Sequence, residues 1–332
     1  MGNVYIIAEA GVNHNGKVTH ALKLCHEALK AGADAVKFQT FKTEKVLTRY
    51  VKLAAYQKKN IGIDQSQFDM IKKLELSYKD FKEIKVFCDK IGIDFLSTPA
   101  EEESLEFLIS LGLETIKIGS GEINNLPYLR KVGQKHKDII LSTGMATLAE
   151  VKTAFETLSK AGSRSVALLH CTTNYPCLMN EVNLRAMGVL KDTFKTKVGY
   201  SDHTLGIEVS IAAVAMGAEI IEKHFTLDKH MIGPDHKASL DPQALQSMIT
   251  AIRHIEKALG DGIKKPQASE IEIMKVVKKS IVASKRISKG DVLTEKNITV
   301  KRAVNGISSA EWDNVIGRKA VKNYDKDECI EF

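Results

Sequence analysis

The chain has 332 residues, of which 44% are hydrophobic and 27% charged, and its formal net charge is +7. This is the composition of a globular protein, long enough for one large domain and a small one. The start, MGNVYIIAEAG, lacks a basic segment before a long apolar one, and no apolar run suffices to span a bilayer. We therefore expect a cytoplasmic protein with no membrane partner. Its basic residues alternate with acidic ones and lack interleaved aromatic side chains, which argues against a nucleic-acid partner.

Short apolar or β-branched runs recur along the chain and alternate with helical patterns. We expect strands at residues 4–11, 35–40, 95–99, 115–120, 139–144, 166–171, 197–202 and 220–226. Amphipathic segments between them, such as 19–32 and 148–162, end at glycine, the usual helix stop. Eight strands with intervening helices predict a (β/α)8 TIM barrel over residues 1–263. A doubly wound sheet is the alternative, although no G-x-G-x-x-G follows any strand.

The last part of the chain has a different pattern. Residues 264–279, which include the Lys/Pro/Ser-rich KKPQASE, are expected to form a linker. Residues 280–332 are rich in β-type residues and in Gly/Asn turns, with little helical periodicity. So small a β-rich domain is marginally stable alone, so we expect it to dock on another surface.

Five cysteines are scattered along the chain without a C-x-x-C spacing. This usage is typical of a reduced compartment and unlike a structural zinc site. Cys171, at the end of an apolar run, is either a nucleophile or an inert buried thiol.

Polar side chains follow the expected strands at their carboxyl ends. In a TIM barrel these ends meet at one mouth, so we expect an active site there. The residues are Glu9, Lys37, Gln39, Thr98, Lys117, Ser120, Ser142, Thr173, Ser201, His203, Glu222 and His224.

The stretch GYSDHTLG contains Ser201, Asp202 and His203 side by side, which raises the question of a hydrolase triad. Successive side chains of a strand point to opposite faces, so Asp202 cannot share a face with its two neighbours. Ser201 and His203 share a face, and a neighbouring strand with Glu222 and His224 would converge on them. The alternative is a pair of strand-end histidines bonded to backbone.

Two kinds of chemistry fit this mouth. Lys37 and Lys117, with the glycines and hydroxyls of GSGE and STG, suit a phosphate and carboxylate pocket, unless the lysines only form structural ion pairs with Glu9 or Glu122. His203 and His224 are the best candidates for metal ligands, because two imidazoles with open positions suit a catalytic Zn, Mn, Co or Fe ion. Such an ion would polarise a carbonyl oxygen.

Nine motifs taken together resemble one known family. They are AEAGVNHNG, VKFQTF, FLSTP, KIGSGEINNLPYL, ILSTGMA, LLHCTTNYP, GYSDHT, IEKHFTLD and GPDHKAS. In this order they are similar to the sialic acid (N-acetylneuraminate) synthase family, and SIVASKRISKGDVLTEKNITVKR resembles its C-terminal antifreeze-like (SAF) domain. The resemblance implies condensation of phosphoenolpyruvate with an N-acylated mannosamine-type sugar, giving a nine-carbon α-keto acid and phosphate.

The resemblance also implies residue roles. The metal, Mn first with Mg or Co as alternatives, would be held by His203 and His224. Phosphoenolpyruvate would bind to Lys37, Thr98, Lys117, Ser120, Ser142, Thr173 and Ser201. The sugar would contact Gln39, Tyr175, Asp235 and Arg302. The catalytic residues would be Lys117, Glu9, which would position the attacking water, and Glu222, which would transfer a proton.

Three questions stay open at this stage. The stretch around Gly62 lies near the sugar in the family and matches poorly here, so the substrate is N-acetylmannosamine or the diacetylated 6-deoxy sugar of a legionaminate or pseudaminate synthase. The family forms a domain-swapped homodimer, which would bring Arg302 to the partner's site, but an action in the same chain is the alternative. A non-catalytic sugar-binding protein is the remaining alternative; a neutral sugar would need neither the lysines nor the histidines.

Overall fold

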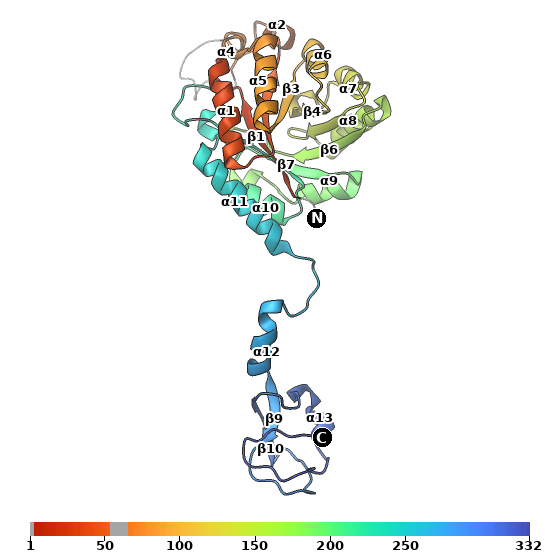
Figure 1. Cartoon of the computed structure of the whole chain (residues 1–332). Helices are drawn as coiled ribbons and strands as arrows, with labels where there is room; N and C mark the ends of the chain where they lie inside the picture. Colours follow the sequence, from red (N-terminus) through yellow and green to blue (C-terminus); the bar gives the residue numbers. More distant parts are fainter. Residues whose placement is uncertain (1–2, 54–65) are drawn as a thin grey trace. The chain divides into compact units, whose positions relative to one another are not determined.

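The computed structural model describes residues 3–53 and 66–332, so the stretch around Gly62 lies outside the described residues. The chain divides into two compact units, Met1–Gly260 and Asp261–Phe332. Figure 1 shows a strand-and-helix unit and a smaller unit that begins before α12 (Ile271–Val277) and contains it.

The first unit is the predicted TIM barrel. Its strands pair in the order β3-β2-β1-β8-β7-β6-β5-β4, the seven pairs are all parallel, and the end strands β3 and β4 also lie in contact. The strands are β1 (Tyr5–Gly11), β2 (Ala35–Thr40), β3 (Asp94–Pro99), β4 (Thr115–Ile118), β5 (Asp138–Ser142), β6 (Ser165–His170), β7 (Val198–Asp202) and β8 (Ile220–His224). The doubly wound alternative is therefore wrong, because that order closes on itself.

Helices surround the strands in Figure 1. They are α1 (Val18–Ala31), α5 (Tyr78–Ile91), α6 (Glu102–Ser110), α7 (Leu126–Gly133), α8 (Leu148–Ala161), α9 (Ala186–Phe194), α10 (Glu208–Ala215) and α11 (Pro242–Leu259), with the shorter α2 (Thr43–Val46) and α4 (Gln67–Leu74). Local sequence explains their ends. Thr147 and Glu150 form a capping box at the start of α8, and Gly162 ends it at φ 112°, in the left-handed region that glycine tolerates.

Apolar side chains fill the amino-terminal half of the barrel interior. This inner cluster comprises Ile7, Ala35, Leu96, Ile140, Ala167, Leu169 and Ile220. Since side chains on one face of a strand recur every second residue, the next inward positions on five of these strands are Glu9, Lys37, Thr98, Ser142 and Glu222. On these five strands the interior thus changes from apolar to polar within two residues, and the polar positions form the candidate site.

The second unit is small and β-rich, as predicted. Its only regular sheet in the described chain pairs β9 (Lys279–Ala283) with β10 (Ile298–Arg302) antiparallel, and α13 (Trp312–Val315) follows. Its core contains Ile281, Ala283, Ile287, Leu293, Ile298, Val315, Ala320, Tyr324 and Ile330. The segment expected as a linker contains α12.

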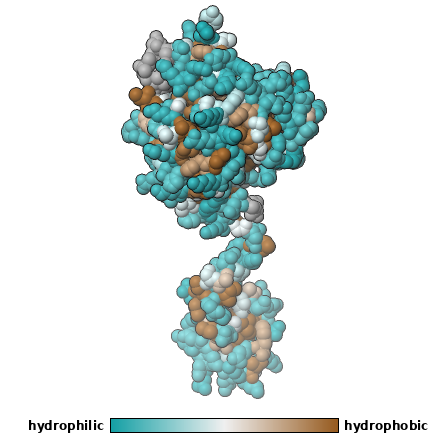
Figure 2. Space-filling model, turned by 45° about the horizontal axis from the view of Figure 1, so that its top comes forward, coloured by the Kyte–Doolittle hydropathy of each residue, from teal (hydrophilic) through white to brown (hydrophobic). Residues whose placement is uncertain are grey.

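Hydrophilic side chains cover most of the surface visible in Figure 2, interrupted by apolar patches. The helix α12 is apolar on several sides, because Ile271, Ile273, Val276 and Val277 are each between 42% and 55% exposed. In the described part of the chain, no helix has the length and apolarity needed to cross a membrane.

Candidate active site

Two buried lysines form the centre of the mouth. Lys37 on β2 and Lys117 on β4 are only 3% and 2% exposed. The Lys37 ammonium lies 2.6 Å from a Glu9 carboxylate oxygen and donates to the Thr98 hydroxyl at 3.3 Å. The Lys117 ammonium donates to the Ser142 hydroxyl at 2.7 Å. The alternative in which the lysines pair only with Glu9 or Glu122 does not describe this arrangement, because Lys117 lies beside Ser142 and Glu222.

Glu222 on β8 lies between the two lysines. Its carboxylate oxygens are 3.7 Å from each ammonium group, and one of them accepts a hydrogen bond from Ser201 at 2.9 Å. Burial alone would raise the pKa of Glu222, but Lys117 and Lys37 outweigh it and lower this pKa to about 2. Burial and the neighbouring Lys37 charge lower the pKa of Lys117. The mouth thus holds an ionised carboxylate between two cations out of contact with bulk water.

A second carboxylate region adjoins this centre. Glu9 on β1 accepts a hydrogen bond from the Gln39 amide at 3.1 Å, and burial raises its pKa despite the adjacent Lys37. Asp235, in the loop after β8, is 8% exposed, and burial together with Glu9 raises its pKa to about 7. Of the expected sugar-binding residues, Gln39 thus contacts Glu9 directly, and Asp235 is near enough for the Glu9 charge to act on it.

The stretch Ser201-Asp202-His203 is not a triad. Asp202 forms a buried ion pair with Lys223 at 2.9 Å and accepts from Ser210 on α10, on the side of the sheet away from the mouth. The Ser201 hydroxyl donates to Glu222 and lies 3.4 Å from His203 Nε2. The prediction that Asp202 faces away from its neighbours is therefore matched by the geometry.

His203 and His224 fit a metal ion by their chemistry. The His203 Nδ1–H donates to the Thr172 carbonyl at 2.7 Å, which leaves a lone pair on Nε2. His224 Nδ1 is buried with no hydrogen-bond partner among the described residues. The two rings lie 5.5 Å apart between centroids. Burial lowers both pKa values, and His203 lowers that of His224 further, so both imidazoles are neutral at pH 7, the form that binds metals.

These two histidines leave positions open on an ion. Within residues 3–53 and 66–332, no group of three His, Cys, Asp or Glu side chains is arranged to hold a metal. Two protein ligands with the remaining positions free for water or substrate are typical of a catalytic rather than a structural site. Tyr175 lies over this pair, with its ring 4.2 Å from that of His203 and 5.5 Å from that of His224.

Ser120, Thr173 and Cys171 lie close together around Gly144. A Cβ at Gly144 would lie 2.2 Å from the Thr173 hydroxyl and 2.9 Å from that of Ser120, so the close approach needs glycine. The Gly144 N–H donates to Ser120 Oγ at 2.9 Å, and the Thr173 hydroxyl has no hydrogen-bond partner in the described chain. The expectation that GSGE and STG form an anion-binding cradle stays a prediction. Cys171 Sγ lies 3.2 Å from the Ser120 hydroxyl.

The loop after β8 is held by residues that sequence reasoning did not single out. Asn13 donates to the Phe225 carbonyl at 2.8 Å and to the Ser239 hydroxyl at 2.9 Å. His236 lies 2.7 Å from the Thr226 hydroxyl and 3.1 Å from Asn15. These contacts lie on both sides of Asp235 in the chain. The only sign of them in the sequence is the presence of polar residues inside the motifs AEAGVNHNG and GPDHKAS. Arg302, by contrast, lies in the second unit at the end of β10 and is exposed.

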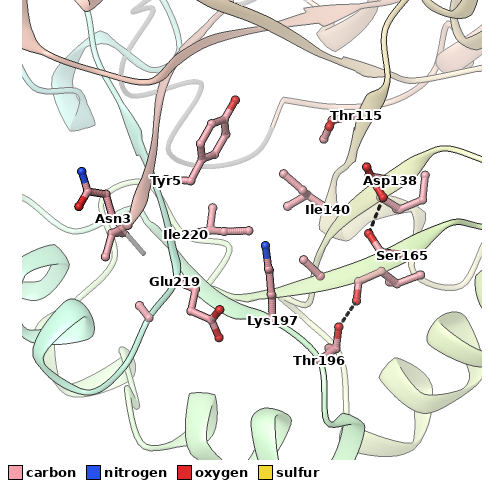
Figure 3. A pocket seen from close by; sticks show the side chains of 15 residues that line it. Asn3, Tyr5, Thr115, Asp138, Ile140, Ser165, Thr196, Lys197, Glu219 and Ile220 are labelled. Atoms are coloured by element: carbon pink, nitrogen blue, oxygen red, sulfur yellow. Dashed lines mark hydrogen bonds between the residues drawn. The ribbon is translucent and has the colours of Figure 1, made fainter. Parts of the chain in front are cut away.

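A cavity of about 790 Å³ opens at the amino-terminal ends of the strands, opposite the mouth (Figure 3). Figure 3 shows Lys197 and Glu219 beside an apolar floor that includes Ile140 and Ile220. The two lysines, two carboxylates and two histidines described above are all absent from its lining. Cavity size and site chemistry therefore point to different ends of the barrel, and the chemistry identifies the candidate site.

The fold is a (β/α)8 barrel whose mouth holds two buried lysines and two carboxylates beside two histidines. Comparison with known proteins gives the family: residues 24–264 match the NeuB family and residues 278–331 match the SAF domain. The chain belongs to the NeuB family, whose members are sugar-acid synthases that use phosphoenolpyruvate and are generally metal-dependent.

Three relatives illustrate the match. The chain is 54% identical over 332 residues, 99% of each chain, to the N,N'-diacetyllegionaminic acid synthase of Campylobacter jejuni. It is 33% identical to the human N-acetylneuraminate-9-phosphate synthase, over 98% of this chain and 91% of that one. The crystal structure of an N-acetylneuraminic acid synthetase from Leptospira borgpetersenii, in complex with citrate, has a TM-score of 0.73 and 37% identity, covering 82% of this chain and 90% of that one.

Proposed function

We propose that this enzyme condenses phosphoenolpyruvate with a diacetylated 6-deoxy amino sugar and water, releasing N,N'-diacetyllegionaminic acid and phosphate. The observation that carries the substrate is the 54% identity, over nearly the whole of both chains, to an enzyme of that name; a second such enzyme, from Legionella pneumophila, is 45% identical. N-Acetylmannosamine is the second candidate, favoured by the relatives named for N-acetylneuraminate at 33% and 37% identity.

Phosphoenolpyruvate would bind across the two lysines. Phosphoenolpyruvate carries negative charge on its phosphate and on its carboxylate. Of the carboxylates near the two buried ammonium groups, only that of Glu9 lies within 3 Å of one of them, and that of Glu222 lies 3.7 Å from both. Hydroxyl donors and acceptors surround this position, which supports an anion pocket. The remaining groups assigned to it are Thr98, Ser120, Ser142, Thr173 and Ser201.

The sugar would lie between His203 and Asp235. His203 and His224 would hold the divalent ion, for which we propose Mn²⁺, with Mg²⁺ or Co²⁺ as alternatives. When bound, the ion supplies a Lewis acid that polarises the aldehyde oxygen of the open-chain sugar. Gln39, Tyr175 and Asp235 would orient the rest of the sugar.

The reaction is a carbon–carbon bond formation followed by hydration. C3 of phosphoenolpyruvate attacks the aldehyde carbon, and a water molecule held by Glu9 adds to C2. The C2–O bond to phosphate then breaks, and the two protons of the water end on the new hydroxyl and on phosphate. The raised pKa of Glu9 makes its carboxylate a stronger base than an exposed one. The lowered pKa of Glu222 makes it a weak base, so we propose that it stays ionised between Lys37 and Lys117 and does not transfer the proton expected from the resemblance.

The test combines a sugar panel with an isotope. The enzyme is given phosphoenolpyruvate, Mn²⁺ and either sugar, and phosphate release and product mass are measured. We expect a higher kcat/KM with the diacetylated 6-deoxy sugar than with N-acetylmannosamine, and ¹⁸O from the bridging position of phosphoenolpyruvate in the released phosphate. No phosphate release with any sugar would leave a sugar-binding protein instead, and label in the keto acid would indicate attack at phosphorus.

We also propose that the enzyme is a domain-swapped homodimer in which Arg302 of the partner chain contacts the sugar's N-acyl carbonyl. Support comes from the family resemblance and from the Arg302 side chain, which has no hydrogen bond or ion pair within the described residues. Mixing the inactive variants Arg302→Ala and His203→Ala should restore part of the activity, because each hybrid dimer has one site with both residues. No recovery, with subunit exchange verified by native mass spectrometry, would contradict the exchange.

A further inference from the structure

Two tripeptides lie side by side in β7 and β8 and extend one residue past the paired ladder. Ser201 pairs with Glu222, and Asp202 pairs with Lys223, which is the last pair in parallel register. His203 and His224 are the next residues along each chain. Ser-Asp-His and Glu-Lys-His therefore run in parallel, with their first and third residues facing the mouth.

The middle residues of the two tripeptides meet on the opposite face. The Lys223 ammonium lies 2.9 Å from Asp202 Oδ2 and donates to the Thr204 carbonyl at 2.6 Å. The other Asp202 oxygen accepts from both the Thr204 N–H and the Thr204 hydroxyl at 2.8 Å, and Ser210 on α10 donates to Oδ2 at 2.7 Å. Both side chains of the pair are 0% exposed.

This arrangement is unusual for the back of a barrel strand. Most side chains between strands and helices are apolar, and a methionine–leucine pair would fill the same space without the cost of burying two charges. A buried ion pair is weak evidence for added stability, but its directed hydrogen bonds fix geometry. Here they fix it one residue before each histidine, at the last pair of the β7–β8 ladder, and neither His203 nor His224 is part of that ladder.

We propose that the Asp202–Lys223 pair, with Thr204 and Ser210, is a positioning device that sets the separation of His203 and His224 for metal binding. Among the described residues, neither side chain of the pair forms a hydrogen bond or ion pair with a histidine ring, and the pair acts through the backbone of the two tripeptides. Thr204 strengthens the argument, because the residue that follows His203 bonds to both members of the pair. His203 is thus held between Asp202 and Thr204, both tied to β8.

The inference rests on the proposed metal site, so the experiment measures metal binding and not turnover. The full-length chain is stripped of metal and titrated with MnCl₂ by calorimetry, with His203→Ala as the variant that loses the site. The test variant is Asp202→Asn/Lys223→Met, which removes both charges together and so leaves no unpaired buried ion. We expect Mn²⁺ affinity to fall about 10- to 100-fold, the range for altered support of metal ligands, with phosphoenolpyruvate affinity within threefold of that of the unaltered chain.

A control separates positioning from general loss of stability. Arg253→Met removes an ion pair to Asp34, at 2.9 Å, at the amino-terminal end of the same barrel. It should lower the melting temperature while leaving the Mn²⁺ affinity unchanged. If the double variant does not fold, the variant Thr204→Val/Ser210→Ala tests the positioning role in its place. It removes two hydroxyl donors to Asp202 and keeps the ion pair. We expect it to bind Mn²⁺ at least threefold more weakly than the unaltered chain.

The outcomes are distinct. No Mn²⁺ binding by the unaltered chain would overturn the metal site and this inference with it. The positioning role alone would be overturned if the folded double variant bound Mn²⁺ as tightly as the unaltered chain. The same holds for Thr204→Val/Ser210→Ala if the double variant does not fold. Weaker Mn²⁺ binding with retained phosphoenolpyruvate affinity supports it.

Discussion

The two ends of the barrel differ in what their polar residues contact. At the amino-terminal end, polar groups around the cavity of about 790 Å³ have ordinary partners: Tyr5 donates to Asp94 at 2.7 Å, and Ser165 donates to Asp138 at 2.7 Å. At the carboxyl end, two lysines and two carboxylates share a region almost without solvent. The candidate active site is therefore indicated by buried charges held close together, and not by the volume of a cavity.

The sharpest way to test this difference is to remove one lysine at each end. Lys117→Met should lower kcat/KM for phosphoenolpyruvate by roughly 10²- to 10³-fold, as expected for losing one charged group that stabilises a bound anion. Lys197→Met at the amino-terminal cavity should change it less than twofold, because Lys197 is exposed and away from the mouth. Phosphate release at several phosphoenolpyruvate concentrations measures both. Equal losses would remove the functional distinction between the two ends.

A carboxyl group in the mouth should also reduce stability at high pH. Asp235 has a pKa of about 7 in the folded chain, against about 4 in the unfolded one. Between these values only the folded state holds the proton, so the free energy of unfolding falls as pH rises from about 4 to 7. Asp235→Asn removes that loss and should stabilise the protein at pH 8, by on the order of 1 to 4 kcal/mol, with no gain at pH 4.

Asp241 provides the control for this prediction. Its carboxylate caps α11 by accepting from the Ala244 N–H at 2.8 Å, and this backbone hydrogen bond lowers its pKa. Its contribution is therefore present above the unfolded pKa and lost as pH falls, so Asp241→Asn should lose stability at pH 8. Thermal unfolding at pH 4, 6 and 8 measures both variants. A gain for Asp235→Asn that is independent of pH would contradict the assigned titration.

Much of this barrel can be predicted from the sequence alone, because its strands and helices follow from local sequence patterns. Period-two apolar runs and glycine stops reveal the strands and helices, and the change from Ile7 to Glu9 on one face of a strand is visible without a structure. The alternation rule also places Asp202 away from Ser201. Motif resemblance added the roles of Lys37 and Asp235, which residue chemistry alone left ambiguous.

Contacts between distant segments could not be predicted in the same way. The Thr172 carbonyl that orients His203 is a backbone atom and carries no side-chain signal. The partner of Asp202 depends on the register of β7 against β8, and a shift of one residue would pair it with another side chain. The cavity at the amino-terminal end likewise results from how side chains of several strands fill space.

A smaller effect is expected at the carboxyl end of the barrel, on the pH above which activity falls. Lys117 must be charged to bind an anion, and its pKa is lowered by burial, so activity should fall at a pH below the ordinary lysine value of about 10.4. Ser142→Ala removes the acceptor 2.7 Å from the ammonium, which favours the charged form. We expect this alkaline limb of the pH profile to move to lower pH by up to about one unit, with kcat/KM at pH 7 reduced about 10-fold or less. A pH profile of kcat/KM checks this, and an unmoved limb would separate Lys117 from the titration.

The smallest effect is expected at the amino-terminal cavity, which has room for a larger side chain but none of the candidate catalytic residues. Ala167, on β6, faces the barrel interior at the amino-terminal cavity, so Ala167→Val adds two methyl groups beside empty space. Burying them should change the free energy of unfolding by no more than about 1 kcal/mol, in the stabilising direction, because valine also suits a strand. Ala154→Val on α8 is the matched control: Ala154 is 0% exposed in the outer core, and overpacking there should cost about 1 to 3 kcal/mol. Urea unfolding gives both values, and kcat should be unchanged in Ala167→Val. A large fall in kcat would show that the amino-terminal cavity communicates with the mouth, and the two ends would then no longer be separable.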